Sequence, residues 1–208
     1  MKSRLIALTA LFVFCCALAA QQGQPTPEQF EAMMKDYMAK YATPGEHQGH
    51  LAAMAGRWST VTKTWPAPGA PVQESKGMAT HKMVLGGRFL QTSYKGSFFG
   101  QAFEGTGHAA YDRYKNKYQE SWIDSMGTML LVSEGQCSNG GKSRTMTASF
   151  DDPMTGQPTV MRSVYTMQDA DHFLLEMYSK QGNAPEYKLM EMHHTRVKAK
   201  KAAAKPAA

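Results

Sequence analysis

The most constraining feature of this sequence is a succession of short runs in which apolar and polar residues alternate. Ten runs have this twofold spacing, which is typical of β-strands. They cover 57–65, 74–84, 88–95, 102–111, 117–124, 128–136, 143–150, 159–167, 172–180 and 187–197. The breaks between them are rich in Gly, Pro, Asn and Asp, which favour turns. Short strands joined by short turns predict an all-β fold, an antiparallel up-and-down barrel of about 8–10 strands that can enclose one small ligand.

An amphipathic helix is expected before the barrel. Thr26 can cap it, Pro27 suits the first helical position, and Gln29 completes a capping box. Apolar residues then recur at helical spacing and form one stripe: Phe30, Met33, Met34, Tyr37, Met38 and Tyr41. Pro-Gly at 44–45 ends this helix, and a second short helix is expected over 46–55.

Residues 1–20 have the pattern of an export signal. Lys2 and Arg4 give a positive start, residues 5–18 form an apolar run, and Ala-Leu-Ala at 17–19 is a small-residue cleavage pattern. The apolar run is shorter than the ~20 residues that a membrane helix needs. We therefore predict a cleaved signal peptide, no transmembrane segment, and a periplasmic or secreted protein.

The formal net charge of +6 belongs to the two ends of the chain. Lys2 and Arg4 lie in the predicted signal, and four more cations follow near the C-terminus: Lys198, Lys200, Lys201 and Lys205. The remainder is therefore formally neutral and lacks the clustered basic residues that nucleic-acid binding requires, so no nucleic acid is predicted as a partner. We predict four parts: a signal peptide at 1–20, an amphipathic helical segment at 21–45, a barrel domain at 46–198 and a disordered Ala/Lys tail at 199–208.

Cys137 is the single thiol once the signal is removed, because Cys15 and Cys16 lie within it. A lipid anchor at those two cysteines is the less favoured alternative, since Phe14 stands where a small residue is expected. No Cys-x-x-Cys pair of the kind found in thiol oxidoreductases or structural zinc sites occurs. The surrounding QCSNGGK is typical of a hairpin turn, so we interpret Cys137 as a half-buried cysteine at a strand end rather than a nucleophile.

Gly56 and Trp58 form a Gly-x-Trp motif at the start of the first predicted strand. A large aromatic residue there can close one end of a barrel, and its indole N–H needs a partner. Arg196 lies on the last predicted strand, which pairs with the first when a barrel closes, so its guanidinium can lie over the indole. We predict that these three residues close one end of the barrel.

This arrangement resembles the lipocalin-like, or calycin, superfamily. Further blocks are similar to a bacterial domain-of-unknown-function family within it: VLGGRFLQTSYKG at 84–96, FEGTGHAAYDRYKNKYQESWIDSMGT at 103–128, SEG at 133–135 and DDPMTGQP at 151–158. Of these, WIDSMGT is the most specific. The resemblance covers roughly residues 46–198. It implies a lipocalin-like, often exported barrel, with no established activity or catalytic residue.

We expect the barrel to hold a small apolar or amphipathic molecule, because such sites are mostly apolar with a few polar groups. The candidate ligand-binding residues lie on the predicted strands: Tyr94, Trp122, Asp124, Met161, Tyr165, Met190, Met192 and His194. Asp124 can instead accept backbone N–H groups of its own turn. A barrel filled by side chains would use the same aromatic and methionine residues. The alternative is therefore a non-catalytic interaction or structural protein, which docks on a partner or on itself through the helical stripe.

The histidines support a third hypothesis, a copper or haem site. His47 and His50 are three residues apart on the second expected helix, a spacing that can hold one metal ion. His193 and His194 are adjacent in a strand and point to opposite faces, with His194 facing inward. Some barrels of the resembled kind bind haem through a histidine near the C-terminal strand, which makes His194 the haem candidate. Core packing by methionines is the simpler interpretation, so we predict no metal and no cofactor.

The sequence contains no recognised catalytic constellation. It has no G-x-S-x-G elbow, no H-E-x-x-H motif and no glycine-rich phosphate loop, and its glycines are interpreted as turn residues. Carboxylates are spread over the strands, and spacing alone selects no acid–base pair among them: Glu104, Glu120, Asp124, Glu134 and Glu176. We predict no catalytic residue, which favours a non-enzymatic protein without deciding the question.

Overall fold

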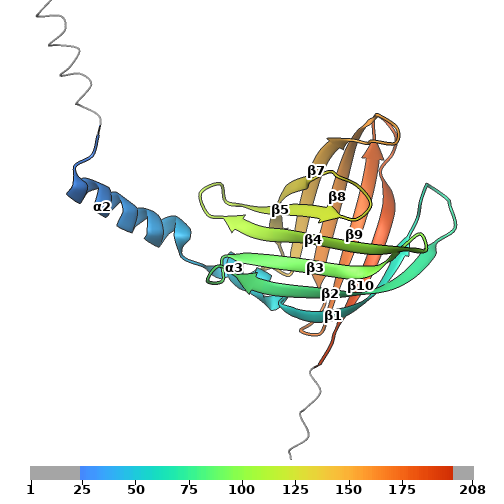
Figure 1. Cartoon of the computed structure of the whole chain (residues 1–208), viewed down its shortest axis with the longest axis horizontal. Coiled ribbons are helices and arrows are strands. Elements are labelled where there is room, and N and C mark those ends of the chain that lie inside the picture. The colour runs from blue at the N-terminus through green and yellow to red at the C-terminus, as the bar shows by residue number, and fades with distance from the viewer. Residues whose placement is uncertain (1–23, 199–208) are drawn as a thin grey trace, which may run out of the picture. The chain divides into compact units, whose positions relative to one another are not determined.

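The structure is a computed structural model that describes residues 24–198 (Figure 1). The predicted signal peptide at 1–20 and the predicted tail at 199–208 lie outside the described residues. The chain forms two compact units that divide between Ala42 and Thr43. Within residues 24–198, every helix is too short or too polar to cross a lipid bilayer.

The first unit contains helix α2 (Pro27–Tyr37), which continues into a π-helical turn, η1 (Met38–Ala42). Its predicted capping box is present. The Gln29 backbone N–H donates to the Thr26 hydroxyl at 3.3 Å, and the Thr26 N–H donates to the Gln29 side chain at 2.9 Å. The helix ahead of the barrel is thus confirmed.

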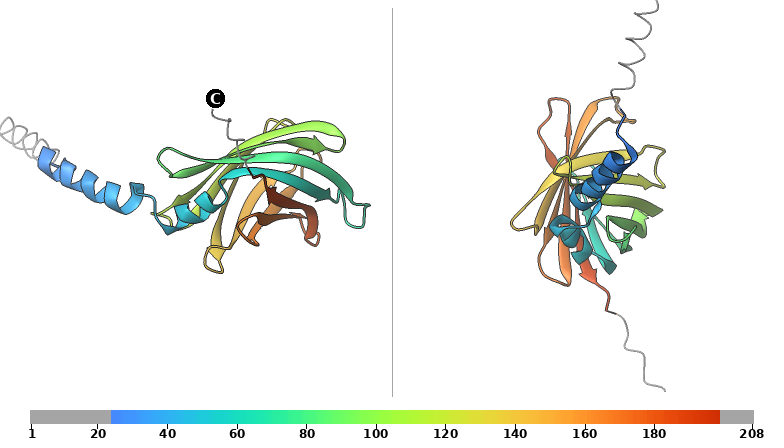
Figure 2. Two further views of the ribbon diagram at one scale, coloured as in Figure 1. Left: turned by 90° about the horizontal axis from the view of Figure 1, so that it is seen from below. Right: turned by 90° about the vertical axis from the view of Figure 1, so that its left-hand side faces the viewer.

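The second unit begins with a short helix, α3 (Glu46–Ala53), followed by ten antiparallel strands. They are β1 (Gly56–Thr64), β2 (Gln73–Val84), β3 (Phe89–Phe98), β4 (Gln101–Asp112), β5 (Lys117–Asp124), β6 (Leu131–Ser138), β7 (Ser143–Asp151), β8 (Pro158–Met167), β9 (His172–Gln181) and β10 (Tyr187–Arg196). Each strand pairs with the next in sequence, and β10 pairs with β1, so the sheet closes into a barrel (Figures 1 and 2). The all-β, up-and-down barrel prediction is confirmed.

The observed bounds of β3 and β6 differ from the predicted bounds by up to three residues. β3 runs on to Phe98, three residues beyond the predicted end, and includes Gly96, where a side chain would overlap the Tyr94 ring. β6 starts at Leu131 rather than at 128, since its pairing with β5 begins opposite Trp122. Residues 128–130 lie in the connection between β5 and β6, although they had been predicted to be part of the strand.

One end of the barrel interior is closed by Trp58, which is fully buried at the start of β1. Its indole N–H donates to the Met54 carbonyl oxygen, just beyond the end of α3, at 2.9 Å. The ring meets Phe173 edge to face, with 4.7 Å between the ring centroids. Leu51 of α3 is also fully buried, so this helix and the indole together seal the end.

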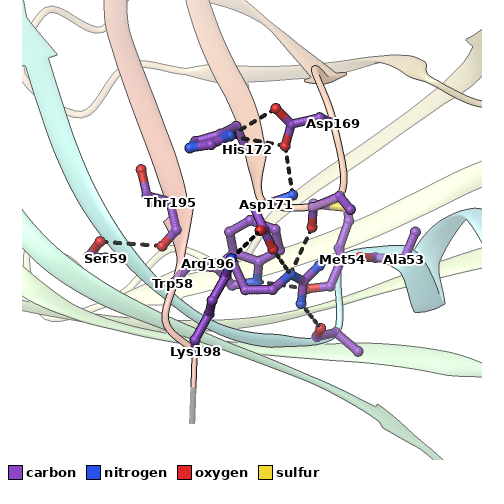
Figure 3. Close-up of polar contacts among 12 residues, drawn as sticks. Ala53, Met54, Trp58, Ser59, Asp169, Asp171, His172, Thr195, Arg196 and Lys198 are labelled. Atoms are coloured by element: carbon purple, nitrogen blue, oxygen red, sulfur yellow. Dashed lines mark hydrogen bonds and ion pairs between the residues drawn. The ribbon is translucent and has the colours of Figure 1, made fainter. Parts of the chain in front are cut away.

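Arg196 covers the other face of this plug (Figure 3). It is the cross-strand partner of Trp58, and its guanidinium carbon lies 4.0 Å from the indole centroid. Its three nitrogens donate to the carbonyl oxygens of Ala170, Ala55 and Ala53 at 2.7–2.9 Å. A cation therefore satisfies carbonyl groups at the end of α3 that would otherwise lack partners.

The backbone conformation and the close packing at position 56 require glycine. Its φ of +136° is a conformation that residues with a side chain rarely adopt, and a Cβ there would lie 2.6 Å from Arg196 Nη1. The structure thus brings Gly56, Trp58 and Arg196 together at one end of the barrel.

Candidate functional site

The barrel encloses a cavity of about 720 Å³. That is within the range of roughly 300–1,000 Å³ typical of small-molecule sites. It extends from Met54 and Phe173, above the Trp58 plug, to residues 126–129 and Pro153 in the connections at the opposite strand ends. The barrel is therefore hollow rather than filled by its own side chains.

All eight residues predicted to bind a ligand line this cavity. Tyr94, Tyr165 and His194 lie toward the closed end, whereas Met161 and Met190 lie toward the other end. Trp122, Asp124 and Met192 complete the predicted set: they also line the wall. Their side chains are thus placed where a ligand would contact them, and ligand binding itself remains a prediction.

Both carboxylate oxygens of Asp124 accept hydrogen bonds from other groups of the protein. One oxygen accepts the Trp122 indole N–H at 3.0 Å, and the other accepts the Met126 backbone N–H at 2.9 Å. Asp124 therefore holds its own turn and orients the Trp122 ring, as aspartates at turn starts commonly do.

Glycines inside the strands make room for the aromatic residues of the cavity. A Cβ at Gly77 or Gly96 would overlap the Tyr94 phenol, and one at Gly105 or Gly107 would crowd the Trp122 ring or a neighbouring carbonyl. The interpretation of the glycines as turn residues is wrong for these four positions. A glycine inside an alternating run is the signal for such a close approach.

A buried ion pair lies in the wall near the closed end. The Arg144 guanidinium of β7 donates to Glu120 of β5 at 2.6 Å, and their side chains are 7% and 15% exposed. The Tyr165 hydroxyl donates to the second Glu120 oxygen at 3.1 Å, and Arg144 lies over the Tyr165 ring. Burial and the neighbouring Glu120 charge raise the pKa of Tyr165, so its hydroxyl remains a proton donor.

Sequence reasoning did not select this pair, although a signal was available. On β7, Arg144 has the same phase as the buried residues Met146 and Ala148, and on β5, Glu120 has the same phase as Tyr118 and Trp122. A charge on the apolar face of each of two nearby strands indicates a buried pair, because either charge alone would be too costly to bury.

Two buried histidines lie beside this pair. His81 Nδ1 is 2.8 Å from the Thr92 hydroxyl oxygen, and the His194 ring stacks on Phe173 with 3.8 Å between centroids. Burial lowers the pKa of His81 to about 4 and that of His194 to about 3. Both imidazoles are therefore neutral near pH 7.

Three buried polar side-chain atoms make no hydrogen bond to any described residue: Thr62 Oγ1, His81 Nε2 and Arg144 Nε. His81 and Arg144 lie toward the closed end, whereas Thr62 lies further along β1, toward the other end. Buried polar groups in proteins are usually paired, so such a group needs an explanation. All three residues line the cavity. The cavity wall thus has unused hydrogen-bonding capacity, at two residues toward its closed end and at one further along β1, and it is otherwise mainly apolar.

The remaining histidines of the third hypothesis lie elsewhere. His193 is on the outer face of β10, where its Nε2 is 2.7 Å from a Glu191 oxygen, so it does not share a site with His194. His47 and His50 lie on α3 and do not line the cavity.

Solved structures with a similar fold share little sequence with this chain. An S-type phycobiliprotein lyase, CPES, from Guillardia theta matches with a TM-score of 0.55 and 11% identity, over 75% of this chain and 95% of that chain. Rv2717c from M. tuberculosis matches with a TM-score of 0.58 and 13% identity, over 75% of this chain and 100% of that chain. At such identities the likeness shows the fold alone, a lipocalin-like barrel.

No curated protein matches the chain in sequence. A protein family does match, over residues 43–196, and its description is "Protein of unknown function (DUF1579)". The match spans α3 and all ten strands, as the sequence resemblance over residues 46–198 had predicted. The chain belongs to the DUF1579 family.

Proposed function

We propose that this protein is an exported carrier that binds a small amphipathic molecule inside its barrel. The observation that supports the proposal is the cavity of about 720 Å³, apolar along most of its wall and polar at its closed end. Apolar walls with a few placed polar groups are typical of ligand sites. Export, to the periplasm or the medium, rests on the signal pattern of residues 1–20 alone.

The polarity of the cavity suggests how the ligand lies. Its apolar part contacts methionine and aromatic side chains toward the end opposite the Trp58 plug, such as Met161, Met190 and Phe103. Its polar group reaches the unpaired atoms of His81 and Arg144 toward the closed end. The Arg144 charge is already balanced by Glu120 and the histidines are neutral. A hydroxyl or carbonyl group therefore fits better than a carboxylate, which would bring an unbalanced charge into the barrel.

Binding of matched probes to the purified protein tests this proposal. We would use a long-chain alcohol, a methyl ketone, an alkylammonium ion and an alkane of equal chain length, and measure displacement of a neutral fluorophore. The alcohol and the ketone are expected to bind at least about fivefold more tightly than the other two, because each hydrogen bond contributes about 1 kcal/mol. If none of the four binds, the carrier proposal fails.

A cavity-filling variant locates the site. Ala148 is buried and lines the cavity, whereas Ser149 is exposed on the outer face of the same strand. Ala148→Phe should abolish probe binding, and Ser149→Phe should leave it unchanged. Equal loss in both variants, or in neither, would place the bound probe outside the barrel.

A second candidate function is self-association or partner docking through α2. The observation that favours it is the exposure of the apolar stripe, whose members Phe30, Met33, Met34 and Tyr37 are all exposed. Deleting residues 21–43 separates two cases. Loss of self-association with an unchanged barrel would support docking through the helix, and loss of barrel stability would show that the helix packs on its own barrel.

A further inference from the structure

Four potential metal ligands converge where α3 meets the closed end of the barrel. His47 and His50 are three residues apart on α3, and Cys137 is the last residue but one of β6. Their donor atoms all lie within 4.8 Å of one another. Tyr118 of β5 adds a hydroxyl. This cluster is separate from the cavity, since neither α3 histidine nor Cys137 lines it.

The distances suit a single small ion. His47 Nδ1 lies 3.7 Å from Cys137 Sγ, and the Nδ1 atoms of His47 and His50 lie 3.1 and 3.2 Å from the Tyr118 hydroxyl oxygen. In a tetrahedral zinc site, with bonds of about 2.0 Å to nitrogen and 2.3 Å to sulfur, the ligand atoms are roughly 3.5 Å apart. His47 and Cys137 are already close to this spacing, and since none of the three protein ligands is more than 4.8 Å from another, a shift of about 1 Å brings them around one ion.

Packing fixes the orientation of both imidazoles. The His47 ring stacks on Tyr111, with 3.7 Å between centroids and 20° between planes. His50 Nε2 lies 3.7 Å from a Glu46 carboxylate oxygen, which leaves Nδ1 facing the cluster. A carboxylate behind a ligating imidazole is a common outer-shell arrangement at metal sites. The His50 ring also occupies the space that a side chain at Gly141 would fill.

We propose that His47, His50 and Cys137 bind one soft transition-metal ion of the Zn²⁺ or Cu⁺ class. Imidazole with thiolate is the ligand set that these ions prefer, and Tyr118 or a solvent molecule can supply the fourth ligand. His50 is 20% exposed, which gives an ion a path to the site. The two histidines alone had suggested a metal; the tertiary structure adds the thiol.

The site would link α3 to the barrel wall. α3 also supplies Leu51 to the plug and precedes the Met54 carbonyl that holds the Trp58 indole. An ion bound by the helix and β6 together would therefore stabilise the closed end. Because it binds the folded state selectively, it should raise the melting temperature of the protein.

Metal titration of the purified full chain tests the proposal, with Zn²⁺ measured by competition with a chromogenic chelator and Co²⁺ by its absorption. We expect one ion per chain and a cobalt–thiolate charge-transfer band. Cys137→Ser should abolish the band, and both Cys137→Ser and His47→Gln should weaken Zn²⁺ binding by about 100-fold or more, the upper end of the loss seen for outer-shell changes.

His172→Gln is the matched control, because His172 is an exposed histidine paired with Asp169 on the far side of the plug (Figure 3). It should bind Zn²⁺ like the unmodified protein. If His47→Gln does not fold, the near-isosteric Cys137→Ser variant decides. Zn²⁺ binding that is absent, or that is unchanged in Cys137→Ser, would overturn the proposal and leave a hydrogen-bonded cluster that only docks α3.

Discussion

The closed end of the barrel and the cavity wall next to it treat buried polar groups in opposite ways. At the closed end, the Trp58 N–H and all three nitrogens of Arg196 have carbonyl partners. In the cavity wall, the side chains of Thr62, His81 and Arg144 each leave one buried polar atom without a partner among the described residues. Complete pairing stabilises the plug, and incomplete pairing leaves the hydrogen-bonding capacity that the proposed ligand would use. In the proposed carrier, stability and binding therefore depend on different parts of one barrel.

The largest expected effect comes from breaking the buried ion pair of the cavity wall. Glu120→Ala should lower the free energy of unfolding by about 3–5 kcal/mol, because it leaves the Arg144 charge buried and unpaired. Urea denaturation measures this. The double variant Glu120→Leu/Arg144→Met should recover most of the loss, since two apolar residues leave no charge in the wall. A cost below about 1 kcal/mol for Glu120→Ala would mean that water reaches Arg144 in the folded state.

Among the single substitutions, one in the plug should have the next largest effect. Arg196→Met removes three charged hydrogen bonds and a cation–aromatic contact, so we expect a loss of about 2–3 kcal/mol in unfolding free energy. Arg162→Met is the control, because Arg162 lies 4.0 Å from the Tyr178 ring centroid but pairs with Glu186 at the surface. It should cost less than about 1 kcal/mol. Equal costs would mean that the carbonyl contacts of Arg196 add nothing.

Acid should weaken the cavity layer through its histidines. The unfolded imidazoles titrate near pH 6.5, whereas burial lowers the pKa of His81 to about 4 and that of His194 to about 3. The unfolded chain therefore binds more protons as the pH falls from about 6.5 towards those values, and stability is lost in that window. At pH 5 the loss is on the order of 2 kcal/mol per histidine, from 1.36 kcal/mol per pH unit.

Urea denaturation at pH 7 and pH 5 measures this loss. His194→Phe should reduce the difference between the two pH values by about half, since one of the two titrating groups is removed. An unchanged pH dependence in this variant would assign the loss to groups outside the cavity.

The smallest effects compare Gly56, beside the plug, with Gly49, inside α3. Gly56→Ala should destabilise by about 1–3 kcal/mol, since alanine is strained at a φ of +136° and its Cβ meets Arg196. Gly49→Ala, inside α3 with open space around it, should stabilise by up to about 1 kcal/mol. Thermal unfolding of both variants checks the opposite signs. If both variants lost stability to a similar extent, the space around Gly49 would be more closely packed than the structure indicates.

Alternation in the sequence was enough to predict ten strands and their order. A half-buried strand of a barrel has one face toward solvent and one toward the interior. Its alternation of polar and apolar residues can therefore be recognised from the sequence of that strand alone. β7 is an example, with Arg144, Met146 and Ala148 buried and the intervening Thr145 and Thr147 exposed. The same local rule placed the predicted cavity residues on the inward face.

The parts of the site that sequence reasoning missed depend on residues far apart in the chain. Glu120 and Arg144 were readable as charges on apolar faces, but their pairing requires β5 and β7 to lie near each other. The meeting of Cys137 with His47 joins residues 90 positions apart. The spacing of residues in the sequence does not predict a contact over such a separation, because the contact depends on where α3 packs against the barrel.

The sequence by itself determined the strand pattern, the cap of α2, and the Gly56–Trp58–Arg196 closure, since each follows from local periodicity or from the pairing of first and last strands. Only the tertiary structure decided that the barrel is hollow, which buried polar atoms lack partners, and that a thiol joins two histidines. Those properties depend on how side-chain volumes fill a closed space. Composition can be the same in a filled and in an open barrel, and packing alone distinguishes them.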